Sequence, residues 1–235
     1  MKSIIQHAFF LIFGLGIFPG TLLSTENQSR KMTMWYDKPA TVWNEALPIG
    51  NGRLGAMVFG SPAAEKLQLN EETFWSGGPS RNDNPNALAA LPEIRRLIFE
   101  DKYYEAERLV NQNMMTPRNG SKYQIVGNLN LTFPEHGNFT GYRRELNLDN
   151  AVFTAEYKVN GVKFRREIFA SKPDQVIVLR LTADKPGKLT FDATLDSPLQ
   201  KGVRVTNGNT LEMSGLSGDH EGIQGKVKSL TQAKI

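Results

Sequence analysis

The chain has 235 residues, of which 40% are hydrophobic and 22% charged. This composition excludes a disordered or fibrous chain, and the length suffices for one domain with a sizeable hydrophobic core. The formal net charge is +4, from 28 Lys and Arg against 24 Asp and Glu, and acidic residues interrupt the basic ones along the chain. Because nucleic-acid-binding proteins usually carry a concentrated basic face, we expect no nucleic-acid partner.

The first residues have the pattern of a secretory signal. Lys2 precedes an uncharged run over residues 8–23, and a polar segment follows it. The run is shorter than the roughly 20 residues of a membrane-spanning helix, and Pro19 interrupts it. We therefore predict a signal peptide over residues 1–24, a linker over residues 25–33 and no membrane contact beyond the signal. An uncleaved membrane anchor is the alternative.

The chain contains no cysteine. Secreted animal domains of this size often carry disulfides, whereas a bacterial periplasmic domain with a full core needs none. Together with the signal pattern, this predicts a secreted or periplasmic protein of the bacterial envelope. The N-x-S/T triplets of the chain would accept glycans only in a eukaryotic secretory pathway, so we interpret them as chance occurrences.

From residue 34 onward the pattern is mostly that of strands. Apolar or alternating runs at residues 56–60 and 65–70 flank a turn that contains Pro62, and Asn160-Gly161 is a strong two-residue turn signal. The further expected strands lie at residues 128–133, 151–159, 162–168, 175–181, 189–195, 202–206, 210–213 and 226–235. Strands at intervals of about ten residues, with turn signals between them, predict a mainly β fold, a β-sandwich over residues 34–235.

One segment departs from this pattern. Over residues 87–114 the apolar spacing becomes helical, with Ile94 and Leu97 on one stripe and Ala106 and Leu109 on another. Pro92 suits the first turn of a helix. We predict an inserted helical hairpin that either docks a second domain or packs over its own sandwich.

Residues 43–78 (WNEALPIGNGRLGAMVFGSPAAEKLQLNEETFWSGG) place two polar clusters beside apolar runs. An aromatic ring can stack on a sugar while amide, guanidinium and carboxylate groups bind its hydroxyls. Two simpler interpretations are that Glu72 accepts hydrogen bonds from backbone or from Arg53, and that Trp43 and Trp75 fill the core. The candidates for a substrate pocket or domain interface are Asn51, Arg53, Asn70, Glu72 and Trp75.

Hydrolysis of a glycosidic bond commonly needs two carboxyl groups on either side of the bond. The sequence alone does not place any two of its candidates across a sugar; these are Glu71, Glu72, Asp83, Asp219 and Glu221. His136 and His220 lack metal-ligand spacing, and neither a nucleophile elbow nor a dinucleotide fingerprint is present. We therefore expect no metal and no cofactor.

Four segments of the sequence resemble the N-terminal domain of glycoside hydrolase family 95, which comprises α-L-fucosidases and some α-L-galactosidases. They are residues 43–60 (WNEALPIGNGRLGAMVFG), 67–79 (LQLNEETFWSGGP), 84–107 (NPNALAALPEIRRLIFEDKYYEAE) and 123–133. The resemblance implies a β-sandwich that in the full-length enzyme precedes a helical linker, an (α/α)6 barrel and a C-terminal β domain. It also implies hydrolysis of terminal α-L-fucose with inversion, in which a Glu acts as acid and an Asp with Asn residues positions the water.

Those catalytic residues belong to the barrel in the family, and none has a counterpart in this chain. We therefore expect a truncated N-terminal accessory domain of a secreted α-L-fucosidase-like enzyme, inactive by itself. Its expected partners are fucosylated or related glycans and the missing barrel of the same enzyme. Loss of the last sandwich strands would expose a sheet edge. The alternatives are a stand-alone carbohydrate-binding β-sandwich module and a remnant without function.

Overall fold

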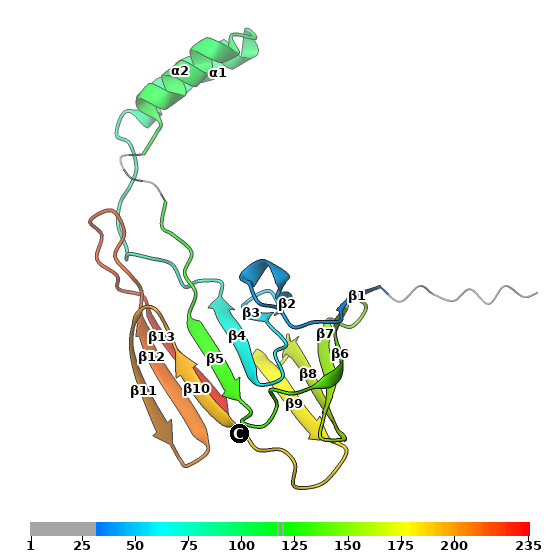
Figure 1. Cartoon of the computed structure of the whole chain (residues 1–235). Coiled ribbons are helices and arrows are strands. Elements are labelled where there is room, and N and C mark those ends of the chain that lie inside the picture. Colours follow the sequence, from blue (N-terminus) through cyan, green and yellow to red (C-terminus); the bar gives the residue numbers. More distant parts are fainter. Residues whose placement is uncertain (1–31, 117, 119) are drawn as a thin grey trace, which may run out of the picture. The chain divides into compact units, whose positions relative to one another are not determined.

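The computed structural model describes residues 32–116, 118 and 120–235. The predicted signal peptide and nearly all of the predicted linker lie outside these residues. The described residues form two five-stranded sheets and one three-stranded sheet, and every pair of strands in them is antiparallel (Figure 1). The prediction of a mainly β fold is confirmed.

The strand order and the bounds of the strands are as follows. The first sheet contains β1 (Thr33–Tyr36), β6 (Thr140–Asn147), β7 (Val152–Val159), β8 (Val162–Ser171) and β9 (Val176–Ala183). The second sheet contains β10 (Asp192–Asp196), β5 (Gly127–Thr132), β4 (Ala64–Glu71), β3 (Leu54–Val58) and β2 (Leu47–Gly50). The third sheet contains β11 (Gln200–Thr206), β12 (Thr210–Leu216) and β13 (Lys228–Lys234).

The main hydrophobic core lies between the first two sheets, with a contribution from the third. Alternate residues of each strand face it, because successive side chains of a strand point to opposite sides. Leu67 and Leu129 come from the second sheet, Phe153 and Ile168 from the first, and Met213 from the third; all are buried in one cluster. The period-two pattern of residues 128–133 and 153–168 therefore predicted the core face correctly, whereas Ala151 lies in the turn before β7 and is exposed.

A buried polar cluster lies in the same interior. The guanidinium of Arg166 donates to Glu65 Oε2 at 3.0 Å, to the Tyr157 hydroxyl at 2.7 Å and to two backbone carbonyls of the β3–β4 turn. His136 Nδ1 lies 2.9 Å from the same hydroxyl. Burial raises the pKa of Glu65 against the opposing charge of Arg166, and burial also lowers the pKa of His136. Since each buried charge has partners, the cluster holds the two sheets together at this point.

Three strands were not predicted from the sequence: β1, β2 and β6. β2 contains Pro48, which is tolerated because this strand lies at the edge of the second sheet and Pro cannot donate to a ladder. In β6 the buried side chains are Leu146 and the polar Arg144, whose guanidinium donates to the carbonyls of Lys38 and Glu45 at 2.8 and 2.7 Å. Its burial therefore breaks the polar-outside pattern on which the prediction of a strand depends.

The predicted helical hairpin is present as α1 (Ala87–Phe99) and α2 (Tyr103–Asn113). The described contacts of the two helices are mainly with each other, around Ile94, Leu97 and Ala106, so the pair is not a cover of the sandwich. Pro92 lies in the interior of α1, which corrects the expectation that it occupies the first turn.

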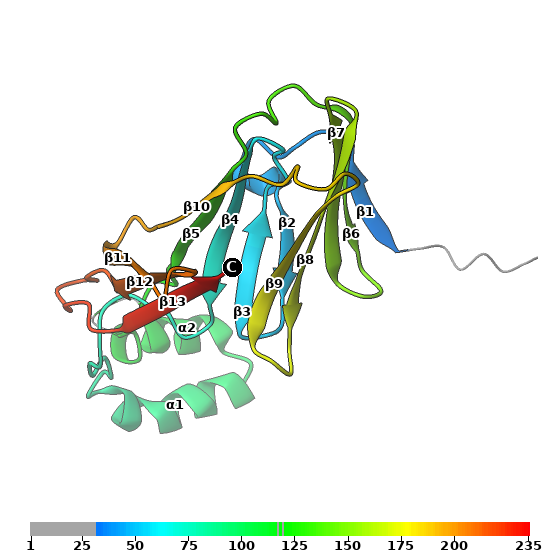
Figure 2. The same ribbon diagram turned by 90° about the horizontal axis from the view of Figure 1, so that it is seen from below.

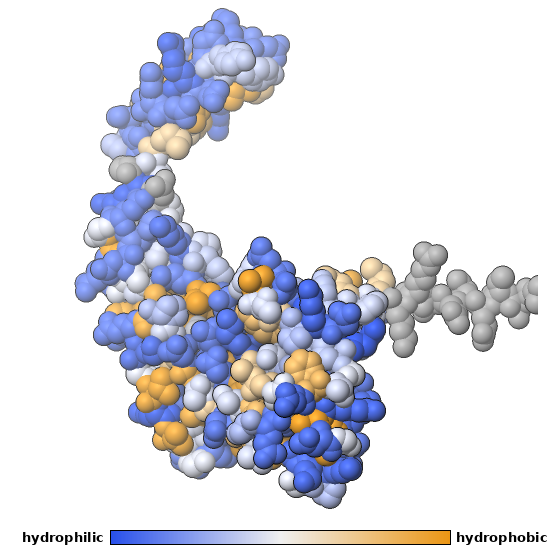
Figure 3. Space-filling model, in the orientation of Figure 1, coloured by the Kyte–Doolittle hydropathy of each residue, from blue (hydrophilic) through white to orange (hydrophobic). Residues whose placement is uncertain are grey.

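Hydrophobic side chains gather along one side of the helix pair (Figure 3). Five hydrophobic residues of the pair are exposed, namely Leu88, Ile98 and Phe99 of α1 and Tyr103 and Tyr104 of α2. The hairpin therefore keeps apolar surface that its own contacts do not bury. Neither of the two described α-helices has the length and hydropathy needed to cross a membrane.

Candidate functional site

The turn between β2 and β3 is built around Asn51. Its side-chain oxygen accepts hydrogen bonds from the backbone N–H groups of Arg53 and Leu54 at 3.0 and 2.8 Å, and its amide donates to the Ser171 carbonyl at 2.7 Å. Asn is suited to this position because its short side chain can bond the backbone two or three residues onward. Both ends of the Asn51 amide are thus used by the fold, since they tie the second sheet to the end of β8.

Arg53 and Glu71 form an ion pair at the same end of the second sheet. Arg53 Nε donates to Glu71 Oε1 at 3.1 Å, and the other carboxylate oxygen accepts from the backbone and hydroxyl of Thr73 at 2.8 and 2.6 Å. Partial burial raises the pKa of Glu71, but the Thr73 hydrogen bonds and the Arg53 charge outweigh it and lower the pKa. The partner of Arg53 is therefore Glu71, which corrects the interpretation that assigned it to Glu72.

Glu72 begins the turn that leads out of β4. Its N–H donates to the Arg53 carbonyl at 3.0 Å, and its own carbonyl accepts from the Trp75 indole at 2.8 Å. The Trp75 ring meets the Tyr123 ring edge to face, with 5.2 Å between the ring centres. Glu72 and Tyr123 are both exposed, so the turn presents a carboxylate and an aromatic pair to solvent.

The expectation that Trp43 and Trp75 fill the core is wrong. Trp75 is 42% exposed and Trp43 is 53% exposed. The Trp43 indole donates to Gln68 Oε1 at 2.7 Å, which holds the ring against the outer side of β4. Exposed Trp rings that are fixed by a hydrogen bond can serve as platforms for a sugar or for another protein surface.

The structure therefore brings four of the five predicted site residues into one hydrogen-bonded group, namely Asn51, Arg53, Glu72 and Trp75. Asn70 lies next to this group, on β4 opposite Gly55 of β3. Sequence reasoning missed Glu71 as the partner of Arg53, because strand alternation indicates only that Glu71 and Glu72 point to opposite sides.

The other carboxylate and histidine candidates lie elsewhere. Asp219 Oδ1 accepts from the backbone of Gly225 at 2.8 Å, and His220 Nε2 lies 3.9 Å from Glu221 Oε1. His220 borders a small pocket of about 180 Å³ together with Asn82 and Arg118. Among the described residues, no three or more His, Asp or Glu side chains gather as metal ligands would.

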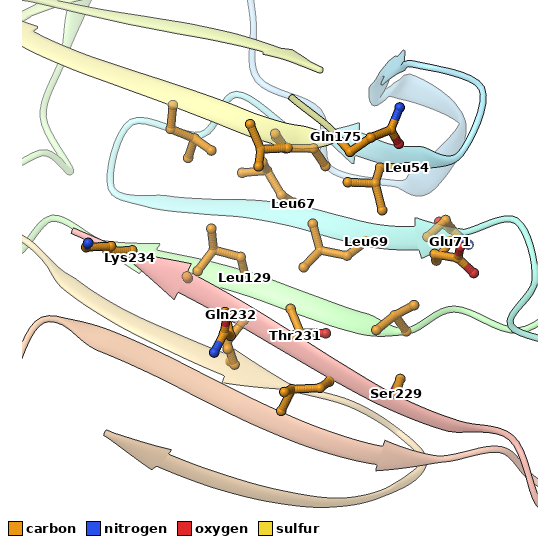
Figure 4. A pocket seen from close by; sticks show the side chains of 18 of the residues that line it. Leu54, Leu67, Leu69, Glu71, Leu129, Gln175, Ser229, Thr231, Gln232 and Lys234 are labelled. Carbon is orange, nitrogen blue, oxygen red and sulfur yellow. The ribbon is translucent and has the colours of Figure 1, made fainter. Parts of the chain in front are cut away.

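A larger groove of about 730 Å³ begins at the Arg53–Glu71 pair and runs between β9 and β13. Figure 4 shows Leu67 and Leu69 of β4 and Leu129 of β5 lining it, with Glu71 and Gln175 at one end. Ile177, Leu179 and Leu181 of β9 line it from the first sheet, and Ser229, Thr231 and Ala233 of β13 from the third. The lining is mainly aliphatic, with polar side chains at the rim.

The sequence contained a signal for this groove that the strand assignment left unused. Residues 175–181 (QVIVLRL) are apolar on both sides of the strand, which is typical of a strand covered on both faces. In the structure β9 is the last strand of the first sheet, and its residues Ile177, Leu179 and Leu181 line the groove.

Comparisons with known proteins agree with one another. The family model described as "Glycosyl hydrolase family 65, N-terminal domain" matches residues 34–234. Alpha-L-fucosidase 2 of Arabidopsis thaliana is 44% identical over 181 residues, which are 76% of this chain and 21% of that protein. The probable alpha-fucosidase A of Aspergillus niger is 36% identical over 196 residues, 78% of this chain and 24% of that protein. The probable alpha-fucosidase A of Aspergillus oryzae is 32% identical over 172 residues, which are 69% of this chain and 23% of that protein. The chain thus spans about a quarter or less of the length of these relatives.

Proposed function

Because the chain belongs to the family of glycosyl hydrolase family 65 N-terminal domains, we propose that it is the N-terminal sandwich domain of an enzyme that hydrolyses terminal α-L-fucosyl linkages. The observation that carries this proposal is the set of relatives, which are named α-fucosidases and match more than two thirds of this chain. Terminal α-L-galactosyl linkages are a second substrate class of the same chemistry.

In this proposal the catalytic acid and base come from a part of the enzyme outside this chain, an (α/α)6 barrel. The geometry supports a catalytic acid and base outside this chain, because the Glu71 carboxylate already accepts hydrogen bonds from Arg53 and Thr73. A carboxylate whose pKa is lowered in this way is a poor general acid at neutral pH, since it gives up its proton too easily.

The group formed by Arg53, Glu72 and Trp75 then acts as one wall of the substrate pocket or of the interface with the barrel. Arg53 keeps four N–H donors beyond its bond to Glu71, and the Trp75 ring is open to a sugar or to a neighbouring domain. Asn51 supports this wall through the backbone of Arg53.

The test compares the isolated chain with an enzyme that joins it to the barrel region. We expect the isolated chain to release no fucose from fucosylated oligosaccharides, and the joined enzyme to release it. Fucose release by the isolated chain would contradict the proposal, because the acid and base would then lie within it.

The wall is tested in the joined enzyme with Arg53→Ala and Trp75→Ala. Each is expected to reduce kcat/KM by about tenfold, the effect of losing roughly 1.4 kcal/mol of binding. Trp35→Ala is the matched control, because Trp35 is also exposed but lies on β1 of the first sheet. Unchanged activity and unchanged association of the two parts in both variants would refute the role of the wall.

A stand-alone carbohydrate-binding module is the second candidate function, and the exposure of Trp43 and Trp75 favours it. Calorimetric titration of the isolated chain with fucosylated glycans tests it. Heat that disappears in Trp75→Ala or Trp43→Ala would support a module, and no heat at all would refute it.

We further propose that the protein is secreted or periplasmic, on the basis of the charge and hydropathy of residues 1–24. Mass spectrometry of the mature protein from a bacterial host is expected to show an N-terminus at Thr25. Retention of Lys2 in the mature protein would contradict this.

A further inference from the structure

The outer face of the second sheet carries amide side chains. Leu67 of β4 and Leu129 of β5 point into the core, so the residues between such positions point away from it. Figure 2 shows the first sheet on one side of the second. The outward amides are Gln68 and Asn70 of β4 and Asn128 and Asn130 of β5. Asn is depleted in strands, so this set needs a reason other than strand formation.

The outer face of the first sheet is built differently. Arg165 of β8 pairs with Glu156 and Glu167 at 2.6 and 3.0 Å, and Arg180 of β9 pairs with Glu167 at 3.4 Å. Opposite charges on the same or the adjacent strand support a sheet face that meets water. The amides of the second sheet form no such charged lattice, which indicates that its outer face serves another purpose.

The amides are arranged in rows across the strands. Gln68, Asn128 and Asp196 of β10 lie directly opposite one another, and two strand spacings make this row about 10 Å long. Asn128 Oδ1 is buried and has no hydrogen-bond partner among the described residues. The side chain as a whole is only partly buried, so rotation of its amide can bring the oxygen to the surface. An acceptor without a donor gains free energy when a ligand supplies one.

Trp43 stands at the end of this row. It belongs to the short 3-10 helix η1 (Trp43–Glu45), and its indole donates to Gln68 Oε1 at 2.7 Å. The ring is 53% exposed although its N–H is fixed. A small apolar cluster anchors the surrounding segment on the outer side of β3; it consists of Ala40, Ala46, Phe59 and the partly buried Met57. The row therefore joins a fixed aromatic ring to a series of amides.

We propose that the outer face of the second sheet binds a neutral oligosaccharide chain, with one sugar ring stacked on Trp43 and the following rings along Gln68 and Asn128. The apolar C–H face of a sugar suits an aromatic ring. Sugar hydroxyls both donate and accept hydrogen bonds, as do the side-chain amides. The site rests on the glycan substrate class of the proposed function and deepens it, since it adds a contact formed by residues other than Arg53, Glu72 and Trp75.

Other classes of ligand fit this face less well. The charges at its margin have opposite signs: Lys66 lies over the Phe59 ring at 4.0 Å, and Asp196 pairs with Lys201 at 2.8 Å. A strongly charged chain would therefore meet no row of opposite charge. A protein partner usually needs a buried apolar centre, whereas the centre of this face consists of amides.

The three Trp residues of the chain allow a direct test, because each indole N–H gives its own NMR signal. The chain is titrated with two neutral sugars, cellohexaose as an extended glucose chain and fucosyllactose as a fucosylated one. We expect at least one of them to shift the Trp43 signal in a saturable manner and to leave Trp35 and Trp75 unchanged. No shift at Trp43 with either sugar would overturn the proposal. A shift at Trp75 as large as that at Trp43 would overturn it in favour of the wall, and equal or tighter binding of trigalacturonate would overturn the preference for a neutral chain.

Variants locate the contact within the sheet. Trp43→Ala should weaken sugar binding about tenfold and Asn128→Ala about threefold, measured by the same titration on backbone amide signals of β5. The matched controls are Trp35→Ala and Thr182→Ala, which alter the first sheet and should bind as the unmodified chain does. Thermal unfolding shows which variants are folded, and Asn128→Ala decides the matter if Trp43→Ala is not. Binding by Asn128→Ala equal to that of Thr182→Ala would overturn the proposal.

Failure of this site and failure of the fucosidase role give different results. Fucose release by the joined enzyme, without any sugar-induced shift at Trp43, would overturn the site and leave the fucosidase role intact. A saturable shift at Trp43, with no fucose release by the joined enzyme, would support the site and contradict the fucosidase role.

Discussion

Two regions of the space between the sheets differ sharply. Around Arg166 even charged groups are fully buried, because Glu65, Tyr157 and backbone carbonyls accept hydrogen bonds from the two terminal guanidinium nitrogens. Around Leu179 the residues are apolar, yet they stay partly exposed beside a groove of about 730 Å³. Burial in this protein therefore follows from what each side chain meets across the sheets and not from its own polarity.

The largest expected effect on stability concerns the buried polar cluster around Arg166. Arg166→Met removes the charge partner of Glu65 and leaves a buried carboxylate uncompensated, which should reduce the free energy of unfolding by about 3–5 kcal/mol. Urea unfolding measures it. The double variant Glu65→Leu with Arg166→Met should recover most of the loss, because no buried charge is left unpaired. A loss below about 1 kcal/mol in the single variant would show that this pair does not hold the region together.

The next effect compares the two sides of the groove. Leu67→Ala deletes a fully buried side chain and should cost about 3 kcal/mol, whereas Leu179→Ala should cost about 1 kcal/mol, because part of its surface is already in water. Both are measured by urea unfolding. Equal losses would mean that Leu179 on β9 is packed as tightly as Leu67 on β4.

A smaller expected effect is the difference between Asn51 and Arg53 in their contribution to the free energy of unfolding. Asn51→Ala removes three hydrogen bonds that shape the turn and join the sheets, and should cost about 1–2 kcal/mol. Arg53→Ala removes an exposed ion pair and should change stability by less than about 1 kcal/mol. Thermal unfolding of both variants checks the order. A larger loss for Arg53→Ala would assign that residue a structural role in place of the proposed pocket wall.

The smallest expected effect is a dependence of stability on pH. Burial lowers the pKa of His136 in the folded protein below its ordinary value of 6.5, so folding favours the neutral ring. The resulting stability is present above pH 6.5 and is lost as the pH falls below it, because the unfolded chain then binds the proton first. Between pH 7.5 and 5, Tm of the unmodified chain should fall about 2 °C further than Tm of His136→Gln. An identical fall in both proteins would contradict this.

Much of the fold follows from local pattern. The alternation at residues 128–133 and 151–159 predicts β5 and β7, and Asn160-Gly161 predicts the turn that joins β7 to β8. The change to helical spacing predicts the two helices of the hairpin. The resemblance to the N-terminal domain of an α-L-fucosidase-like enzyme is confirmed, although the matching family model carries the number 65 and not 95.

The candidate site was predicted as a group of residues but not as a set of contacts. The sequence indicates that Asn51, Arg53, Glu72 and Trp75 lie near strand ends, where turns gather. It does not indicate that the Asn51 amide is used by the fold or that Trp75 is exposed, because both depend on atoms from distant segments, such as the Ser171 carbonyl and the Tyr123 ring.

The sequence by itself determined the β-sandwich and the inserted helices, because turn residues and periodicity act over a few neighbouring positions. The family followed from the resemblance of four of its segments. Only the tertiary structure decided that Arg166 and Arg144 are buried, that Arg53 pairs with Glu71, and that the apolar strand β9 borders an open groove. These outcomes depend on which strands face one another across the sandwich. Contacts between residues about a hundred positions apart, such as Glu65 and Arg166, are not encoded in any local pattern.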